Sequence, residues 1–334
     1  MSTLAFDLGG TYLRCGLIDD RDNVRNLKKL AIPNAFNGHA PPSVWREIID
    51  VMASYCRANA TVAMQAAPIV IAFPGPVRDG RHAVCAPTVV GSSAPPDIVT
   101  MLGLQTGRDV FMLNDVSAAA WHLSGQLNVS PFMVVTISSG IGSKVVTGNP
   151  ETHVFDGAPH SGEIGHLVVD PALDAPACSC GGRGHLGAIA SGRGTQALAR
   201  RMALADPDAY AASACARELG GEPSALTNEA HLVPAARSGD PWAWKVIVAA
   251  MEPLAVTLSC TTQAIGLQRI VLIGGFAHEL GERYAAELTE RMRVYCDGGA
   301  CAASVDGLVT VWQADDEPCL RGAAAYARTL QLTR

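Results

Sequence analysis

The chain has 334 residues, of which 49% are hydrophobic and 17% charged, and its formal net charge is −6. This hydrophobic content excludes an intrinsically disordered chain, and the length fits two domains or one large bilobal domain. The acidic balance, without any cluster of Lys and Arg in the sequence, argues against a nucleic-acid-binding protein.

The N-terminal segment and the cysteines favour a cytoplasmic protein. The segment has no basic stretch and its apolar run stops at Asp7, so we expect neither a signal peptide nor a membrane span there. No other apolar run in the sequence reaches the roughly 18 residues of a membrane span. Apart from Cys178 and Cys180, the cysteines show no spacing typical of a disulfide framework, and we expect them to be reduced.

The first half of the chain predicts strands around a glycine turn, followed by a helix and further strands. Hydrophobic periodicity and breaker residues place strands at 4–7, 13–19, 24–32, 69–73 and 109–113, and helices at 41–60 and from 117 to about 124. A Gly-Gly-Thr turn joins the first two strands. The strand at 69–73 is short and apolar throughout, which is typical of a buried strand.

The second half repeats this plan. Strands are predicted at 132–138, 143–147 and 269–273, a glycine turn at 139–142 joins the first two, and a helix follows the third. The repetition predicts an α/β fold with an internal duplication. The segment 151–192 is rich in Gly, Pro, His and Cys, and we expect an irregular insert of the kind that often carries functional residues.

The first glycine turn is a candidate phosphate-binding site. Asp7 ends a strand and is followed by Gly9, Gly10 and Thr11. Glycines let backbone N–H groups approach a phosphate, and Thr11 adds a hydroxyl donor. The carboxylate of Asp7 can hold a hydrated Mg²⁺ ion. The alternative is an ordinary Gly-Gly hairpin that has an acidic residue before it.

The second glycine turn contains Ser139 and Gly140 and occupies the matching place in the other half. Two such turns in a repeated unit favour a phosphate chain held between the halves. Neither turn has the GxxxxGK[ST] pattern, so the P-loop class is disfavoured. A GxGxxG match at 182–187 does not follow a hydrophobic strand, and we reject a dinucleotide site there.

Asp115 is the candidate general base. The Asn114-Asp115 pair follows a predicted buried strand, and a carboxylate at the C-terminal end of such a strand faces the ligand crevice of an α/β protein. There it can accept the proton of a substrate hydroxyl that attacks phosphorus. An acidic residue before a helix is also typical of an N-cap, and the position alone leaves both interpretations open.

A Cys/His group predicts a zinc site. Cys178, Cys180 and His185 lie close together in the sequence, and His166 precedes them. Two thiolates and two imidazoles form a tetrahedral zinc ligand set, and the short spacing favours a structural zinc that holds an irregular loop. The alternative is two free thiols and two surface histidines.

Taken together, the motifs resemble those of the ROK family of sugar kinases and repressors. The resemblance runs from residue 4 to about 326 and rests on DLGGT at 7–11, PGPV at 74–77, ND at 114–115, SSGIG at 138–142, GEIGH at 162–166, CSCGGRGH at 178–185, ARSGD at 236–240 and IGG at 273–275. It implies a bilobal actin-like (ribonuclease H-like) ATPase fold with two lobes around a cleft. One lobe would comprise 1–116 and a C-terminal helix at 318–334, and the other 117–317 with a zinc loop at 160–187.

The resemblance also implies roles for particular residues. Asp115 would be the catalytic base, Asn114, Glu163 and His166 would bind sugar hydroxyls, and Gly75 would approach the sugar through its backbone. His166 would also ligate the zinc.

The nucleotide and partner expectations follow from the same resemblance. ATP with Mg²⁺ would be the phosphoryl donor, and a homodimer or homotetramer is expected. The residues expected to hold the nucleotide are Gly10, Thr11, Ser139 and Gly140 at the phosphates and Gly274 and Gly275 at the adenosine.

Three positions depart from the family pattern. His185 replaces the third cysteine of the zinc loop, Gly187 replaces a glutamate that holds sugar hydroxyls near the anomeric end, and Thr88 lies where the family tends to have asparagine. The missing glutamate removes a charged acceptor worth about 1.5–3 kcal/mol per hydrogen bond. We therefore expect a kinase for glucose, an amino sugar, an N-acetylated hexosamine or a cyclitol, and favour a ligand modified at the anomeric side.

Two other functions are weighed. A ROK repressor would need a helix-turn-helix before the first strand, for which we expect no room because the strand begins by Thr3. A sugar sensor without catalysis is disfavoured by the presence of Asp115 and both glycine turns.

Overall fold

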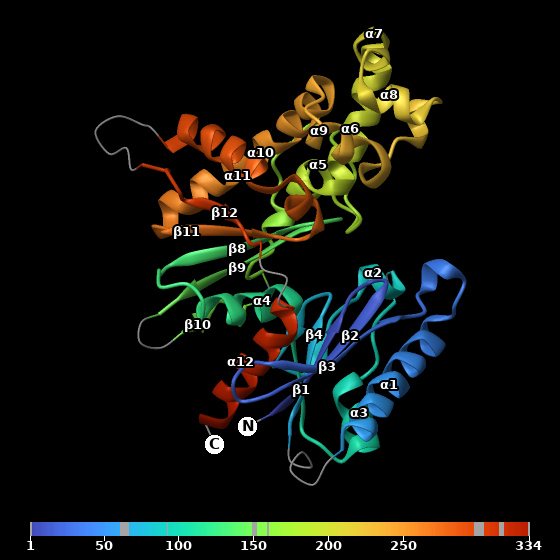
Figure 1. The fold of residues 1–334 in the computed structure, drawn as a ribbon, viewed down its shortest axis with the longest axis vertical. Helices are drawn as coiled ribbons and strands as arrows, with labels where there is room; N and C mark the ends of the chain where they lie inside the picture. The colour runs from blue at the N-terminus through green and yellow to red at the C-terminus, as the bar shows by residue number, and fades with distance from the viewer. Residues whose placement is uncertain are drawn as a thin grey trace. The chain divides into compact units, whose positions relative to one another are not determined.

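The computed structural model describes residues 2–60, 67–91, 93–148, 152–158, 160–296, 304–313 and 317–332. The chain forms two compact units. Unit 1 comprises residues 1–128, 154–161 and 315–334, and unit 2 comprises 129–153 and 162–314. Each unit is built on a five-stranded mixed sheet with helices packed against it (Figure 1).

The sheet of unit 1 has the strand order β3-β2-β1-β4-β7. The antiparallel hairpin of β1 and β2 is extended by antiparallel β3, while β4 and β7 run parallel to β1. The strands are β1 (Thr3–Leu8), β2 (Tyr12–Ile18), β3 (Val24–Ala31), β4 (Ile69–Phe73) and β7 (Val110–Asn114), and β5 (Val77–Arg78) pairs separately with β6 (His82–Ala83). The helices are α1 (Pro41–Ala58), α2 (Pro87–Val90), α3 (Ile98–Thr106), α4 (Asp115–Ser124) and α12 (Pro318–Leu332).

Alternating side chains of β1 divide the core of unit 1 between the two faces of the sheet. Leu4, Phe6 and Leu8 pack with residues of α1 and α3, whereas Ala5 packs with residues of α4 and α12. Figure 1 shows α1 and α3 on one side of this sheet and α4 and α12 on the other. Successive strand residues point to opposite faces, so Asp7 lies on the same face as Ala5. The fold thus brings Asp7 to the side of the sheet that carries α4 and α12.

Helices α4 and α12 approach each other closely enough to require glycine. A Cβ atom at Gly322 of α12 would overlap the carbonyl group of Ala118 in α4. This packing holds α4 within unit 1, whereas the sequence-based boundary at residue 116 separates α4 from the first lobe.

The sheet of unit 2 has the order β10-β9-β8-β11-β12, which repeats the plan of unit 1. Here too an antiparallel hairpin carries a third strand on one side and two parallel strands on the other. The strands are β8 (Phe132–Ile137), β9 (Ile141–Thr147), β10 (His153–Val154), β11 (Arg269–Ile273) and β12 (Val309–Val311). The helices are α5 (Leu186–Ala190), α6 (Gly192–Ala205), α7 (Pro207–Ala211), α8 (Ala214–Leu219), α9 (Val233–Arg237), α10 (Pro241–Ile265) and α11 (Gly275–Cys296).

Helix α10 is, within the described parts of the chain, the one helix whose length and composition would allow it to cross a membrane. More than half of its most apolar stretch is buried inside the protein, where Val246, Met251 and Leu254 join the core of unit 2. A core helix passes the same test of length and composition, and this helix packs as one.

Candidate active site

Asn114 is the last residue of β7, and Asp115 is the first residue of α4. The Oδ1 atom of Asn114 accepts hydrogen bonds from the backbone N–H groups of Val116 (3.0 Å) and Ser117 (3.3 Å). Asn114 is therefore the N-cap of α4, and Asp115 is its first helical residue. The N-cap interpretation of Asp115 is wrong, because its neighbour fills that role. The helix also begins two residues earlier than the predicted start at 117.

The environment of Asp115 raises the pKa of its carboxyl group to about 7. Burial is the main cause and the nearby charge of Asp7 adds to it, while the backbone N–H of Val116, which donates to Oδ1 at 2.8 Å, opposes both. A carboxylate with a pKa close to neutral binds a proton far more readily than an ordinary aspartate. The side chain remains partly exposed, so a substrate can reach it.

Asp7 forms an ion pair on the same side of the sheet. Its Oδ2 atom accepts a hydrogen bond from Nη1 of Arg14 at 2.8 Å, and Nε of Arg14 lies 3.4 Å from a carboxylate oxygen of Glu317. Burial raises the pKa of Asp7, and the guanidinium of Arg14 opposes that shift. Asp7 thus lies next to a cation that favours its charged form against the effect of burial.

Cys319 of α12, near the C-terminal end of the chain, lies close to Asp7 and Asp115. Its thiol lies 3.6 Å from the backbone carbonyl oxygen of Asp115. Burial, with the nearby charges of Asp7 and Asp115, raises the pKa of Cys319 well above its ordinary value. The thiol therefore stays protonated at neutral pH and packs beside Asp115 as a small uncharged side chain.

Gly75 is tied directly to Asn114. The side-chain Nδ2 of Asn114 donates a hydrogen bond to the carbonyl oxygen of Gly75 at 3.1 Å. A Cβ atom at Gly75 would overlap the carbonyl group of Cys85, so only glycine fits this backbone path. The structure thus brings together Gly75, Asn114 and Asp115, three of the residues predicted to contact the substrate.

We expect Gly75→Ala to destabilise the protein by about 1–3 kcal/mol, because the new methyl group forces the backbone away from Cys85. The same shift should stretch the Asn114–Gly75 hydrogen bond and raise the KM for the acceptor substrate. Urea unfolding and steady-state kinetics measure both effects. Gly157→Ala is the matched control, since a Cβ atom there meets nothing within 4 Å. Equal stability of the two variants would contradict this account of Gly75.

The first glycine turn is held mainly by its own backbone. The N–H of Gly9 donates to the carbonyl oxygen of Tyr12 at 2.9 Å and so closes the hairpin. Gly10 lies against Thr88, whose carbonyl oxygen would be 2.8 Å from a Cβ atom at position 10. Gly9 thus has a structural use for its N–H, while Gly10 is partly exposed and Thr11 is exposed.

The second glycine turn borders a cavity of about 500 Å³ within unit 2. Ser139 and Gly275, predicted at the phosphates and at the adenosine, both line this cavity. Nε of Arg193 donates to the carbonyl oxygen of Ser139 at 2.7 Å and fixes the turn. Part of the wall is apolar and is formed by Val233, Pro234 and Phe276. A cavity with an apolar wall at one part and a serine-glycine turn at another suits a nucleotide.

Gly274 and Gly140, two further glycines predicted to contact the nucleotide, differ in their surroundings. Gly274 has a φ of +94°, and a Cβ atom there would lie 2.7 Å from the carbonyl oxygen of Ile137. Glycine is therefore required at 274 for the ends of β11 and β8 to meet beside Gly275. A Cβ atom at Gly140 would meet nothing within 4 Å, so this position is open to an approaching ligand.

Glu163 and His166 lie on a segment that is pressed onto β9. Cβ atoms at Gly162 or Gly165 would overlap carbonyl oxygens of that strand, so the glycines allow this close approach. Oε2 of Glu163 lies 3.9 Å from Nε2 of His166, and both side chains are partly exposed. Two of the three residues predicted to bind sugar hydroxyls thus form one polar group.

His166, Cys178, Cys180 and His185 meet as the sequence predicts, with their ligand atoms all within 4.8 Å of one another. Nδ1 of His166 lies 3.4 Å from Nδ1 of His185 and 3.9 Å from Sγ of Cys178, and Sγ of Cys180 lies 3.2 Å from Nδ1 of His185. Tetrahedral zinc with ordinary bond lengths separates such ligands by about 3.3–3.8 Å. The donor set and its spacing therefore fit zinc.

The sequence profile described as ROK family matches residues 3–330. The chain belongs to the ROK family. It is 37% identical over 328 residues to a C(7)-cyclitol 7-kinase of Streptomyces hygroscopicus subsp. jinggangensis, an alignment that covers 96% of this chain and 92% of that protein.

Solved structures show the same mixed α/β fold. A ROK family glucokinase from Streptomyces griseus, in complex with glucose and AMPPNP, superposes with a TM-score of 0.76 at 24% identity, covering 98% of this chain and all of that one. A ROK hexokinase from Thermus thermophilus superposes with a TM-score of 0.71 at 28% identity, covering 99% of this chain and 100% of that one.

Within the ROK pattern, the departures at Gly187 and Thr88 are now placed. Gly187 is in the first turn of α5, and a Cβ atom there would lie 3.1 Å from the carbonyl oxygen of Gly165. Thr88 is exposed on α2 and lies against Gly10. Both positions neighbour predicted site residues.

The sequence analysis did not identify Arg14, the ion-pair partner of Asp7. The register of the β1–β2 hairpin makes these residues direct cross-strand partners, with Leu8 opposite Leu13 beside the turn. Counting outward from the Gly-Gly turn would have placed a basic residue opposite the acidic one.

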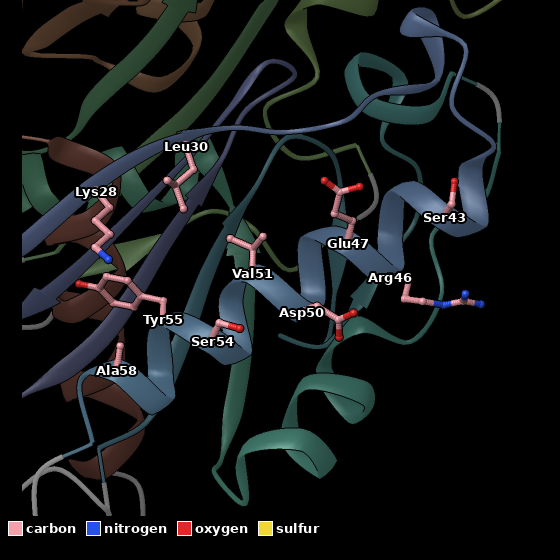
Figure 2. Close-up of a pocket in the computed structure, with 10 residues that line it drawn as sticks. All are labelled: Lys28, Leu30, Ser43, Arg46, Glu47, Asp50, Val51, Ser54, Tyr55 and Ala58. Carbon is pink, nitrogen blue, oxygen red and sulfur yellow. The ribbon is translucent and has the colours of Figure 1, made fainter.

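A second hollow, of about 680 Å³, lies within unit 1 between α1 and β3. Figure 2 shows its lining, with Lys28 and Leu30 coming from β3 and the others from α1. None of the predicted ROK site residues is among those that line it. We therefore give this hollow no part in the chemistry.

Proposed function

We propose that this ROK protein is an ATP-dependent kinase that phosphorylates the primary hydroxyl of a hexose-like substrate, with a carbocyclic sugar analogue (a cyclitol) as the preferred class. The observation that carries the proposal is the carboxylate of Asp115, which is relieved of helix capping by Asn114 and held at a pKa of about 7. The 37% identity with a C(7)-cyclitol 7-kinase over nearly the whole chain supports the substrate class. The absence of a carboxylate at Gly187 is consistent with a ligand that differs from glucose at its anomeric end.

In the proposed reaction, the substrate's hydroxyl oxygen attacks the γ-phosphorus of ATP as Asp115 accepts the hydroxyl proton. The bond between the γ-phosphorus and the bridging oxygen breaks, and the products are ADP and a phosphate monoester. In unit 1, Asn114 and the backbone of Gly75 are proposed to hold the substrate beside Asp115. In unit 2, Glu163 and His166 are proposed to bind other hydroxyl groups of the substrate.

The proposed nucleotide contacts follow the two glycine turns and the cavity of unit 2. Ser139 and Gly140 would bind phosphate oxygens, and Gly274 and Gly275 would lie against the adenosine. These proposed contacts are supported by the cavity of unit 2, because Ser139 and Gly275 both line it. In unit 1, Gly10 and Thr11 would also contact phosphates. The repeated strand order of the two sheets supports the actin-like architecture with an internal duplication.

Two metal ions are part of the proposal. A bound Mg²⁺ would neutralise charge on the ATP phosphates, and Asp7 would hold it through water. A structural Zn²⁺ would hold the irregular loop through His166, Cys178, Cys180 and His185. The Nδ1 atom of His166 faces the Cys/His cluster, and its Nε2 atom faces Glu163. The metal would therefore orient an imidazole that is also proposed to bind the substrate.

We expect kcat/KM to rise with pH along a limb centred at about pH 7, because Asp115 must be deprotonated to act as a base. Binding of ATP and Mg²⁺ changes the local charge, so kcat can follow a different limb from kcat/KM. A profile between pH 5 and 9 measures both. A flat profile down to about pH 5 would contradict the raised pKa of Asp115 as the source of activity.

A coupled assay for ADP across a panel of acceptors tests the function. The panel comprises C7-cyclitols, glucose, mannose, glucosamine and N-acetylated hexosamines, each with ATP and Mg²⁺. We expect the highest kcat/KM with a cyclitol that bears an exocyclic hydroxymethyl group. Turnover of glucose alone would overturn the preference, and no turnover of any acceptor would leave the sensor alternative as the better one.

Assembly and location complete the proposal. A homodimer or homotetramer in the cytoplasm is supported by the family resemblance, and size-exclusion chromatography with light scattering tests the assembly.

A further inference from the structure

Arg14 lies where phosphoryl transfer is proposed to take place. It is the direct cross-strand partner of Asp7, and opposite residues of an antiparallel pair point to the same face of the sheet. The glycine turn with Gly10 and Thr11 lies between these two strands. The guanidinium is thus fixed beside the proposed phosphate contacts of unit 1.

The contacts of Arg14 leave part of its donor capacity for a ligand. Nη1 donates to Asp7 and Nε lies near Glu317, and about one third of the side chain is exposed (33%). A guanidinium carries five N–H donors in a planar fork, which matches the oxygens of a phosphoryl group. The two carboxylates therefore aim the group without using all of its donors.

Arg14 offsets negative charge at the proposed site of phosphoryl transfer. Arg14 is surrounded by acidic groups, since it pairs with Asp7 and Glu317, and the charge of Asp7 acts in turn on Asp115. A polyphosphate that approaches three carboxylates is repelled unless positive charge is held among them. Arg14 supplies that charge in a fixed position.

A purely structural role is less well supported. Helix α12 is itself joined to the β2–β3 turn by two other arginines: Nη1 of Arg328 donates to Oδ1 of Asp22 at 2.8 Å, and Arg321 donates to the backbone carbonyl of Asp22. The ion pair of Arg14 with Glu317 is longer than these bonds.

We propose that Arg14 is a further catalytic residue, whose guanidinium donates hydrogen bonds to the phosphoryl group during its transfer. This inference rests on the proposed kinase function. As the oxygen–phosphorus bond to the acceptor forms and the bond to ADP breaks, negative charge on the transferred oxygens is stabilised by Arg14, which keeps its protons. Asp115 takes the single proton that the acceptor releases.

The test compares Arg14→Ala and Arg14→Lys with Glu317→Gln, which removes one ion-pair partner but keeps the arginine. We expect Arg14→Ala to lower kcat by about 10²–10³-fold while the KM for the acceptor changes less than about threefold. Arg14→Lys should recover part of kcat, and added guanidinium should partly restore Arg14→Ala. Glu317→Gln should lower kcat less than Arg14→Lys does, because it keeps the guanidinium beside Asp7 and removes only one of its two ion-pair partners.

A binding measurement separates catalysis from structure. Arg14→Ala should bind ADP as the wild type does, yet lose the gain in affinity that ADP acquires with aluminium fluoride, a mimic of the transferred phosphoryl group. Equal losses for both ligands, or a fully active Arg14→Lys, would assign Arg14 a structural role. If Arg14→Ala does not fold, Arg14→Lys decides, and we expect a stable variant with a lowered kcat.

The outcomes also separate this inference from the function on which it rests. A wild type that transfers no phosphate to any acceptor overturns the kinase proposal and this role of Arg14 together. An active wild type with an equally active Arg14→Ala overturns only the role of Arg14.

Discussion

Asp115→Asn should lower kcat by about 10²–10⁴-fold while the affinities for ATP and the acceptor change little. The amide keeps the shape of the carboxylate and can still accept the backbone N–H of Val116, but it cannot take the proton of the attacking hydroxyl. Steady-state kinetics and calorimetric binding measure the two effects. Activity close to that of the wild type would remove Asp115 from the role of base.

The same variant should gain stability in alkaline solution. The folded-state pKa of Asp115 is about 7, above its ordinary value of 3.8, so its contribution to stability is complete at acidic pH and is lost as the pH rises through 7. Asparagine has no proton to lose, and Asp115→Asn should therefore have the higher Tm at about pH 8. Asp208→Asn, at an exposed carboxylate in the first turn of α7, is the matched control.

A fall in kcat together with a rise in Tm cannot come from misfolding. A lower Tm for Asp115→Asn at alkaline pH would contradict the poorly hydrated, charged state that we infer for Asp115.

Cys180→Ser should remove zinc from the protein and lower kcat/KM by more than about tenfold. The serine hydroxyl is a poorer zinc ligand than a thiolate. Loss of the Cys180 thiolate also removes the sulfur atom nearest to His185 in the cluster. His166 would then lose its fixed orientation next to Glu163. Elemental analysis should give one zinc per wild-type chain, and calorimetry should show a lower Tm for the variant.

Cys260→Ser provides the control for this experiment, because Cys260 is an exposed free thiol outside the cluster. It should keep both zinc and activity. A wild-type protein without zinc, or a Cys180→Ser variant with full zinc content, would contradict the metal assignment. His185→Cys should retain zinc, since it restores the ligand type that the family pattern has at this position.

The sheets were predictable because their strands are short, apolar and bounded by glycine turns. The strands at 69–73 and 269–273 have the predicted bounds, since the first is buried throughout and the second at its three central residues. The helices α6 to α10 were not predicted. Helices α7, α8 and α9 have only five or six residues each, too few to show a helical period. Helix α10 is apolar on several sides and so lacks the one-sided pattern by which a surface helix is recognised.

The site was predictable where chemistry narrows the choice of residues. Two cysteines and two histidines in one short region have few other uses, and they meet as expected. The cap of α4 was not predictable, because Asn114 and Asp115 are about equally good capping residues and the backbone decides between them. Arg14 was missed because its meaning depends on hairpin register rather than on any motif.

Unit 1 cannot complete its folding during synthesis until helix α12, at the C-terminal end of the chain, has been translated. Cys319 touches the backbone of Asp115 although 204 positions separate them in the chain, and Gly322 is packed against Ala118. At the usual speed of translation, a ribosome needs about 10–40 s to add such a stretch. The nascent sheet must wait that long with one face uncovered, while the second unit is made in between. A chain released before residue 318 would therefore be inactive, and it would expose the apolar face that chaperones recognise.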